Sequence, residues 1–96
     1  MSLDAVLRAL SDPTRREMLR MLREGDLTAG QLAERFPQAR STLSEHCATL
    51  KSAGLVVTER QGNAIVYSLN VSALEEAVGA VMGLLHVGEE SGDDGK

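Results

Sequence analysis

Apolar residues recur at intervals of three and four up to Gly54, and the period changes after that glycine. The helical intervals predict four helices before Gly54, over residues 3–10, 13–24, 29–36 and 39–54. Beyond it, the β-branched runs over 55–60 and 64–69 flank a Gly-Asn turn, which predicts a two-stranded hairpin. A last helix is predicted from about Val71 to Val87.

Local signals place the ends of the second and third helices. Asp12 is suited to cap the second helix, Pro13 fits its first position, which needs no N–H, and Gly25 ends it. Thr28 can cap the third helix after a brief extended link, and Pro37 closes that helix. Only two or three residues then precede the fourth helix, so the third and fourth helices must cross sharply as a helix-turn-helix.

The fourth helix combines a narrow apolar stripe with a small polar face. Its inward positions are Leu43, Cys47, Leu50 and Ala53. The first two turns of the other face carry Arg40 and short hydroxyl side chains, where a solvated helix usually has long Glu and Lys pairs. Such a face can approach a surface closely, and the major groove of DNA admits an α-helix. Plain solvent exposure of these hydroxyls is equally compatible with the pattern.

The second helix carries four arginines outside its apolar face, at Arg15, Arg16, Arg20 and Arg23. All four side chains are long enough to contact phosphate. For Arg20 and Arg23 we expect instead solvated pairs with Glu17 and Glu24 on the same helix.

The tip of the predicted hairpin is polar and lacks large apolar side chains. It consists of Arg60, Gln61, Gly62 and Asn63. A tip of this composition can lie along a minor groove or a phosphate backbone, and a plain surface hairpin would look similar. We favour the DNA-contacting interpretation because the hairpin directly follows the candidate recognition helix.

The last helix is more apolar than a chain of this size can cover with its own core. Pairing of two copies through the first and last helices would bury that surface. Folding back onto the core is the alternative, and the two are not exclusive. The predicted dimer interface comprises Leu3, Val6, Leu7, Leu74, Val78, Val81, Met82 and Leu85.

Composition indicates one domain with an acidic end. The 96 residues are 43% apolar, enough for one modest core over residues 1–87, whereas 88–96 has hardly any apolar side chain and is expected to be disordered. The net charge is −4, and six acidic residues face Lys96 alone after position 74, so the first 74 residues carry +1. This near-neutral body counts against tight, salt-driven binding to nucleic acid.

The single cysteine excludes an internal disulfide and a cysteine-only metal cluster, and it fits a reducing compartment. No signal sequence and no long apolar run is present, so we expect a soluble cytoplasmic protein without membrane contact. No Ser, His and acid set, no paired carboxylates and no phosphate-binding Gly loop is visible, which argues against an enzyme.

Four segments together resemble the ArsR-type family of winged-helix repressors. They are SDPTRREML over 11–19, GDLTAGQLAERF over 25–36, STLSEHCATLKSAGLV over 41–56, and the strand ending in VYSL at Leu69. The resemblance covers roughly residues 3–85 and is closest to the autorepressor branch resembling the sporulation-delay repressor. It implies a mainly α winged helix-turn-helix with a small β-hairpin that binds inverted-repeat operators as a homodimer and represses transcription, often of its own operon.

Carried over by position, the resemblance assigns DNA contacts to the fourth helix, and the polar hairpin tip adds further predicted contacts. The residues are Arg40, Ser41, Thr42, Ser44, Glu45, His46, Arg60, Gln61 and Asn63. We expect Arg40 and Ser41 to read or position bases. His46 is either a phosphate donor or a buried, hydrogen-bonded side chain. Glu45 stands where the family often has a basic or imidazole side chain, so it accepts from a cytosine or points aside.

Many members of this family sense metals, but the ligand patterns are incomplete here. The third helix has no cysteine, and in the last helix His86 and Glu89 match only half of a site whose other half is occupied by Ala73 and Glu75. Cys47 lies on the inward stripe, where a core role outweighs redox sensing. We therefore expect no metal and no cofactor.

Two alternatives remain open from the sequence. One is a metal- or redox-responsive repressor of the same family. The other is a winged-helix module that binds a partner protein through its apolar last helix and acidic tail, which the near-neutral body favours. A protein that sequesters the repressor would leave no trace in these residues.

Overall fold

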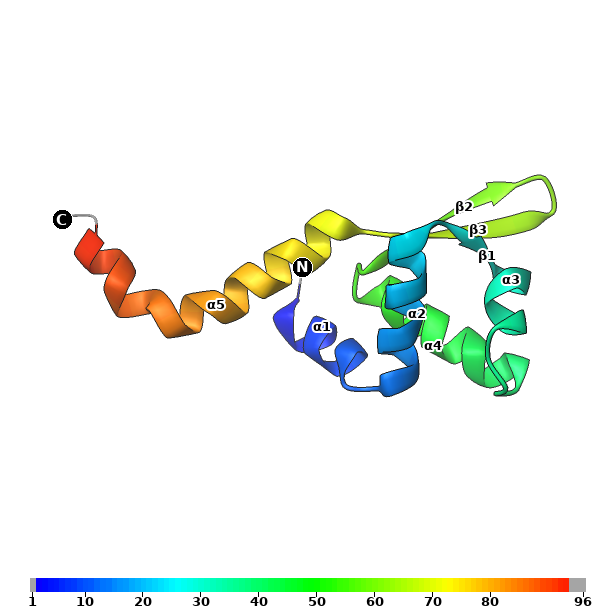
Figure 1. Cartoon of the computed structure of the whole chain (residues 1–96), viewed down its shortest axis with the longest axis horizontal. Coiled ribbons are helices and arrows are strands. Elements are labelled where there is room, and N and C mark those ends of the chain that lie inside the picture. The colour runs from blue at the N-terminus through cyan, green and yellow to red at the C-terminus, as the bar shows by residue number, and fades with distance from the viewer. Residues whose placement is uncertain (1, 94–96) are drawn as a thin grey trace.

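Residues 2–93 are described by the computed structural model, with side-chain surroundings described through residue 85. The elements are α1 (Leu3–Leu10), α2 (Pro13–Glu24), β1 (Leu27–Thr28), α3 (Ala29–Glu34), α4 (Arg40–Ser52), β2 (Val56–Gln61), β3 (Ala64–Leu69) and α5 (Val71–Asp93). Helices α1 to α4 and the sheet form a body from which α5 projects (Figure 1). This order confirms the predicted mainly α winged helix-turn-helix.

The caps expected at the starts of α2 and α3 are present. Asp12 Oδ1 accepts from the backbone N–H of Thr14 at 2.8 Å and of Arg15 at 3.1 Å. Thr28 Oγ1 accepts from Gln31 N at 3.1 Å, while Gln31 Oε1 accepts from Thr28 N at 2.8 Å, forming a capping box. Both helix starts are therefore determined by short-range chemistry in the sequence.

Helix α4 begins without a side-chain cap, because Ala39 occupies the N-cap position. Its other end is defined by Gly54, whose φ of 81° lies in the left-handed region. Leu55 N donates back to Leu50 O at 3.0 Å, which closes the last turn and directs the chain into β2. The C-terminal end of α4 is thus closed by backbone hydrogen bonds, whereas its N-terminal end has no side-chain cap.

The sheet has three strands in the order β1-β3-β2, where the sequence predicted a two-stranded hairpin. The additional strand is the predicted extended link, which pairs antiparallel with β3 through Leu27↔Tyr67 and Thr28↔Val66. The backbone N–H and C=O groups of this two-residue strand find hydrogen-bond partners on the otherwise open edge of β3. The hairpin itself turns at Gly62, with φ of 63°, and Asn63, whose φ is negative, as a type II′ turn requires.

The core lies where α1, α2, α4 and the sheet meet. Its most deeply buried large side chains are Val6, Met18, Leu50, Leu55 and Val56. Cys47 is 8% exposed and belongs to the same cluster, so the predicted core placement of this residue is confirmed. Burial of such apolar side chains is the main favourable term in folding, roughly 1.5–3 kcal/mol for each large one.

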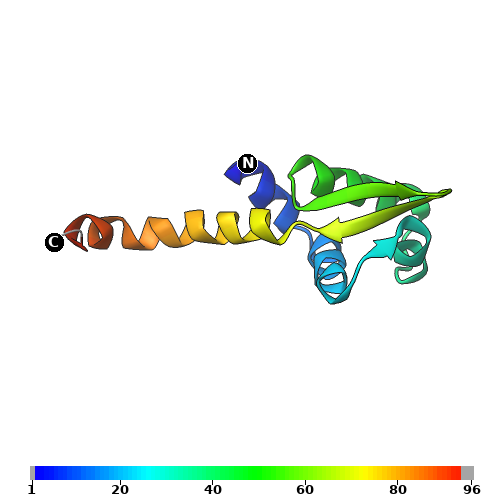
Figure 2. The same ribbon diagram turned by 90° about the horizontal axis from the view of Figure 1, so that it is seen from above.

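Helix α5 leaves the body after its first turns. Ala77 is its one buried residue among those through position 85, and Leu84 and Leu85 are each 73% exposed. Figure 2 shows the rest of the helix extending away from the sheet, and the molecule measures 55 × 24 × 20 Å. Folding of the whole last helix onto the core, the alternative considered from the sequence, is therefore not what the structure shows.

The backbone of α5 continues to Asp93, beyond the end predicted at Val87. No proline follows Val87 to stop the helix, and the backbone hydrogen bonds can continue through Gly88 and Glu89. The predicted acidic tail therefore overlaps the last part of α5, and its residues 94–96 lie outside the described residues. No helix in residues 2–93 is long and apolar enough to cross a membrane.

Asn70 connects the start of α5 to the end of α4. Its Oδ1 accepts from Ala73 N at 3.2 Å and caps α5, and its Nδ2 donates to Gly54 O at 3.0 Å. Its backbone N–H donates to Leu55 O at 2.9 Å. One side chain therefore sets the direction in which α5 leaves the body.

We expect Asn70→Ala to lower the free energy of unfolding by about 1–3 kcal/mol, because it removes the cap and the bond to Gly54 together. Urea unfolding at one fixed protein concentration measures this loss. The matched control is Asn63→Ala, which removes an exposed asparagine from the hairpin turn and should cost little. Equal effects of the two substitutions would contradict this role of Asn70.

Candidate nucleic-acid interface

The N-terminal half of α4 presents a polar face to solvent. Arg40, Ser41, Ser44 and Glu45 are exposed, whereas the predicted inward residues of α4 are buried. The orientation of α4 about its own axis is therefore the one that its apolar period predicted. Its N-terminal end and the tip of the β2–β3 hairpin, or wing, lie at the end of the body remote from the C-terminal end of α5 (Figure 1).

The wing supplies the second group of predicted contact residues. Arg60, Gln61 and Asn63 are all exposed at its tip. The register Arg60↔Ile65 and Gln61↔Ala64 carries the strands up to the turn, so these side chains are held by a paired backbone. The wing and the polar face of α4 thus offer two separate sets of hydrogen-bond donors.

Thr42 and His46 are placed differently from the other predicted residues on α4. Thr42 is half-buried, and the His46 side chain is only 14% exposed. His46 Nδ1 lies 2.9 Å from Arg15 Nη1, and its Nε2 lies 3.9 Å from Asp12 Oδ1. Of the two interpretations left open for His46, the structure matches the buried, hydrogen-bonded one.

The arginines of α2 are engaged within the chain. Arg20 pairs with Glu17 and Arg23 with Glu24, as predicted, and both pairs are exposed. Arg15 and Arg16 instead donate to backbone carbonyls at the end of α1, Arg15 to Arg8 O and Ala9 O and Arg16 to Leu10 O. Each of the four therefore has an acceptor of its own.

The arginines of the candidate interface differ from those of α2 in their ion pairing. Within the described part of the chain, neither Arg40 nor Arg60 has a carboxylate within ion-pair distance. These two side chains are free to meet an anion. They come from the two elements that the sequence predicted to contact DNA.

Gln38, in the turn between α3 and α4, was not among the predicted site residues. Its Nε2 donates to Thr14 Oγ1 at 2.9 Å, which ties the entrance of α4 to the first turn of α2. Its Oε1 is buried without a hydrogen-bond partner among the described residues. Sequence reasoning could not find this contact, because nothing in the local pattern connects two polar residues 24 positions apart.

A small cavity of about 80 Å³ separates α3, α4 and β3, and Cys47 and Tyr67 line it together with Arg40 and Ser44. Burial raises the pKa of the Cys47 thiol, and a hydrogen bond with Tyr67 only partly offsets that rise. Burial and the neighbouring Cys47 also raise the pKa of Tyr67. A thiol kept protonated is a poor nucleophile, which favours the core role of Cys47 over redox sensing.

The described side chains contain no cluster of three or more His, Cys, Asp and Glu residues that could hold a metal ion. Ala73 and the exposed Glu75 occupy the positions of the missing half of the last-helix site. The side chains of His86 and Glu89, the matching half, lie outside the described residues.

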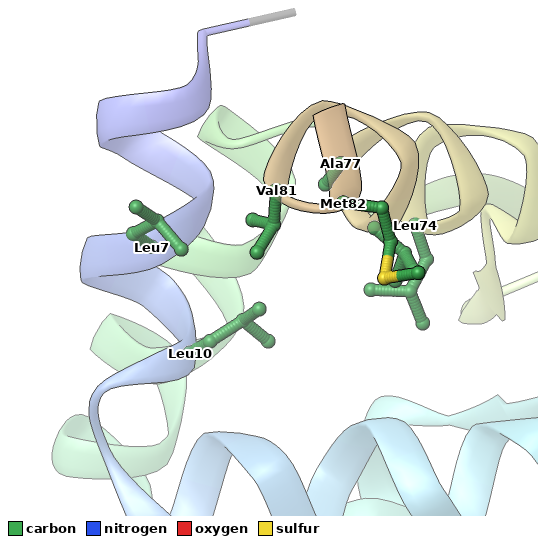
Figure 3. Close-up of a pocket in the computed structure, with 7 residues that line it drawn as sticks. Leu7, Leu10, Leu74, Ala77, Val81 and Met82 are labelled. Carbon is green, nitrogen blue, oxygen red and sulfur yellow. The ribbon is translucent and has the colours of Figure 1, made fainter. Parts of the chain in front are cut away.

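The predicted dimer interface forms a continuous apolar surface on α1 and α5. Leu7 is 47% exposed, Val78 56%, Val81 40%, Met82 47% and Leu85 73%, while Leu3 and Leu74 are half-buried. A hollow of about 180 Å³ runs between the two helices, and Leu7 and Leu10 face Val81, Met82 and Leu74 across it (Figure 3). Such contiguous exposed apolar area marks an interaction site.

Val6 must be removed from that predicted interface. It has no exposed surface and packs in the core beside Ala9. Helical spacing placed Val6 next to Leu7, but the spacing could not tell which side of a short helix faces the chain's own core. Val6 and Ala9 support α1 from within, and Leu7 faces outward.

Asp12 has an electrostatic role besides its capping role. Partial burial raises its pKa, but opposing effects, led by hydrogen bonds from the backbone N–H groups of Arg15 and Thr14, outweigh burial. The net result lowers the pKa of Asp12 below its ordinary value of 3.8. The ionised carboxylate is therefore stabilised at the junction of α2 and α4.

Comparison with known proteins finds close similarity. The sequence model described as bacterial regulatory protein, arsR family, matches residues 12–58. Transcriptional repressor SdpR of Bacillus subtilis is 38% identical over 84 residues, covering 88% of this chain and 93% of that protein. The arsenical resistance operon repressor of Staphylococcus xylosus is 41% identical over 73 residues, covering 76% of this chain and 70% of that repressor. A crystal structure of an ArsR family transcriptional regulator matches with a TM-score of 0.80 and 30% identity, over 93% of this chain and 91% of that chain.

We expect the free energy of unfolding of the wild type to fall more steeply, as the pH is lowered, than that of Asp12→Asn. Asparagine keeps a capping oxygen but cannot lose a negative charge. Because the pKa of Asp12 is lowered in the folded chain, its contribution is complete above the ordinary value of 3.8 and is lost as the pH falls through the folded value. Urea unfolding from about pH 6 to pH 3 tests this, and parallel curves for the two proteins would contradict it.

Proposed function

Because this chain belongs to the arsR family of bacterial regulatory proteins, we propose that it acts as a homodimer on an inverted-repeat operator and represses its own operon. Membership confirms the family inferred from the motifs. It makes the chain a DNA-binding transcriptional repressor and not an enzyme. We propose that it acts in the cytoplasm, where a bacterial operator is accessible.

The observation that carries this proposal is the exposed polar face of α4 together with the exposed wing. In the described part of the chain, the arginines of both have no carboxylate within ion-pair distance. Arg40 and Ser41 lie at the leading end of α4 and are proposed to reach base edges in the major groove. Ser44 and Thr42 are proposed to hold phosphates, Thr42 from its half-buried position. Phosphate contacts of this kind fix the register of the protein on the duplex, and the base contacts supply sequence preference.

The wing residues Arg60, Gln61 and Asn63 are proposed to contact the backbone flanking each half-site. Glu45 is exposed on the same face of α4 and can accept a hydrogen bond from cytosine N4. Near phosphate it would be repulsive, so it favours operators with a cytosine at that position. His46 is left out of the proposed contacts, because its ring is turned toward α2.

The proposed dimer uses the apolar surface on α1 and α5. Two copies related by a two-fold axis would use the same surface on each copy and would bury Leu7, Val81 and Met82 of both. The two α4 helices would then enter successive major grooves about 10–10.5 bp apart. Two copies also double the contacts of a body whose first 74 residues carry only +1, which compensates for weak attraction to phosphate.

We expect Arg40→Ala to weaken binding to a selected operator by ~1–3 kcal/mol, through loss of a direct contact. Fluorescence anisotropy with operators enriched from genomic fragments measures the affinity. The matched control is Arg20→Ala, which removes the same charge from an arginine paired with Glu17 on α2. Equal losses for the two variants would assign the effect to net charge, and unaltered affinity of Arg40→Ala would rule out the proposed contact.

We expect Val81→Glu to convert the dimer to a monomer, because it places a charge in the apolar hollow between α1 and α5. Analytical ultracentrifugation measures the change of mass. The control is Val57→Glu, which introduces the same charge at an exposed position of β2, where Val57 is 50% exposed. A Val81→Glu protein that remains dimeric would show that the subunits associate through another surface.

A further inference from the structure

The first turn of α2 is connected by polar side chains to three other parts of the body. Arg15 makes most of these connections, since its Nε donates to Ala9 O at 2.7 Å and its Nη2 to Arg8 O at 3.1 Å. Its Nη1 lies 2.9 Å from His46 Nδ1 on α4. One guanidinium therefore joins the end of α1 to the middle of the recognition helix.

The chemistry of this contact determines the state of the histidine. A guanidinium carries only donors and stays protonated in proteins, so His46 Nδ1 must accept the hydrogen bond. An imidazole nitrogen accepts only when it carries no hydrogen, which leaves the ring neutral with its single hydrogen on Nε2. That Nε2 is 3.9 Å from Asp12 Oδ1, too far for a hydrogen bond, and Oδ1 already accepts from two backbone N–H groups.

Helix α4 needs directional contacts of this kind. Its apolar stripe packs through non-directional contacts, and Ala39 gives it no side-chain cap. Hydrogen bonds constrain the rotation of a helix about its axis, because they weaken steeply with angle. Gln38 at the entrance of α4 and His46 in its middle both bond to the first turn of α2, to Thr14 and Arg15 respectively.

We propose that Arg15 and neutral His46 form a positioning pair that fixes the rotation of α4, so that loss of the pair reduces discrimination between operator and random DNA. This inference rests on the proposed function, since it concerns how α4 meets its operator. Neither residue touches DNA in this arrangement. The pair sets the angle at which Arg40 and Ser41 are presented.

The first test compares a substitution of His46 that keeps a hydrogen-bond acceptor with one that removes it. In His46→Asn the amide Oδ1 stands near the position of Nδ1 and can accept from Arg15, whereas His46→Leu fills the space without an acceptor. At about pH 7.5 we expect operator affinity of His46→Asn within about twofold of the wild type and a loss of about five- to tenfold for His46→Leu, the value of one hydrogen bond. Affinity for random duplex and the salt dependence of binding should stay unchanged in both, because no charge is altered.

Thermal unfolding measured beside each titration separates misfolding from mispositioning. A His46→Leu protein that keeps its unfolding midpoint but loses operator preference supports the pair. Equal operator affinity of the Asn and Leu variants, both folded, overturns it. Loss of random-duplex binding in parallel with operator binding also overturns it, because that result assigns His46 to general DNA contact.

The second test needs no DNA. Nitrogen-15 NMR of the imidazole ring, assigned by the signals missing in His46→Asn, should show hydrogen on Nε2 and none on Nδ1 at about pH 8. Hydrogen on Nδ1 at that pH overturns the proposal. If the wild type prefers no operator at all, the proposed function fails, and the ring signals still decide whether the pair exists.

Discussion

The fixed placement of α4 on α2 is the constraint on which the rest of this structure depends. Apolar burial holds the two helices together, since Met18 and Leu50 share one core. Direction comes from the polar first turn of α2, which is bonded to the entrance and to the middle of α4. The same turn holds the end of α1 through Arg15. The apolar surface proposed to bind a second copy and the polar face proposed to bind DNA are therefore both fixed relative to the first turn of α2.

The parts of the fold that were predictable from the sequence are those decided by short-range chemistry. Asp12 and Thr28 cap helices because their oxygens reach N–H groups within three residues, and the apolar period of α4 correctly separates Cys47 from Arg40. The pairing of β1 with β3 and the burial of Val6 depend on residues far along the chain, so no local pattern contained them. The exposed candidate site was therefore easier to predict than the contacts that orient it.

His46 illustrates this difference most clearly. Its position on α4 matches a contact face, and position alone left a phosphate donor and a buried histidine equally open. The partner that decides between them, Arg15, lies 31 residues earlier in the chain. An arginine beside the candidate recognition helix suggests DNA contact, yet Arg15 donates to Ala9 O and Arg8 O and bonds to His46. A count of arginines in the sequence thus overestimates the number of positive charges that the body can present to phosphate.

The strand order β1-β3-β2 leaves the outer side of β2 without a neighbouring strand in the described part of the chain. An open strand edge invites pairing with the same edge of another molecule. Here the edge strand carries exposed Glu59 and Arg60 next to Val57, and charges on an edge strand disfavour such pairing. Two copies can therefore lie wing against wing without joining into a shared sheet, so the fold discourages growth of fibres through this edge.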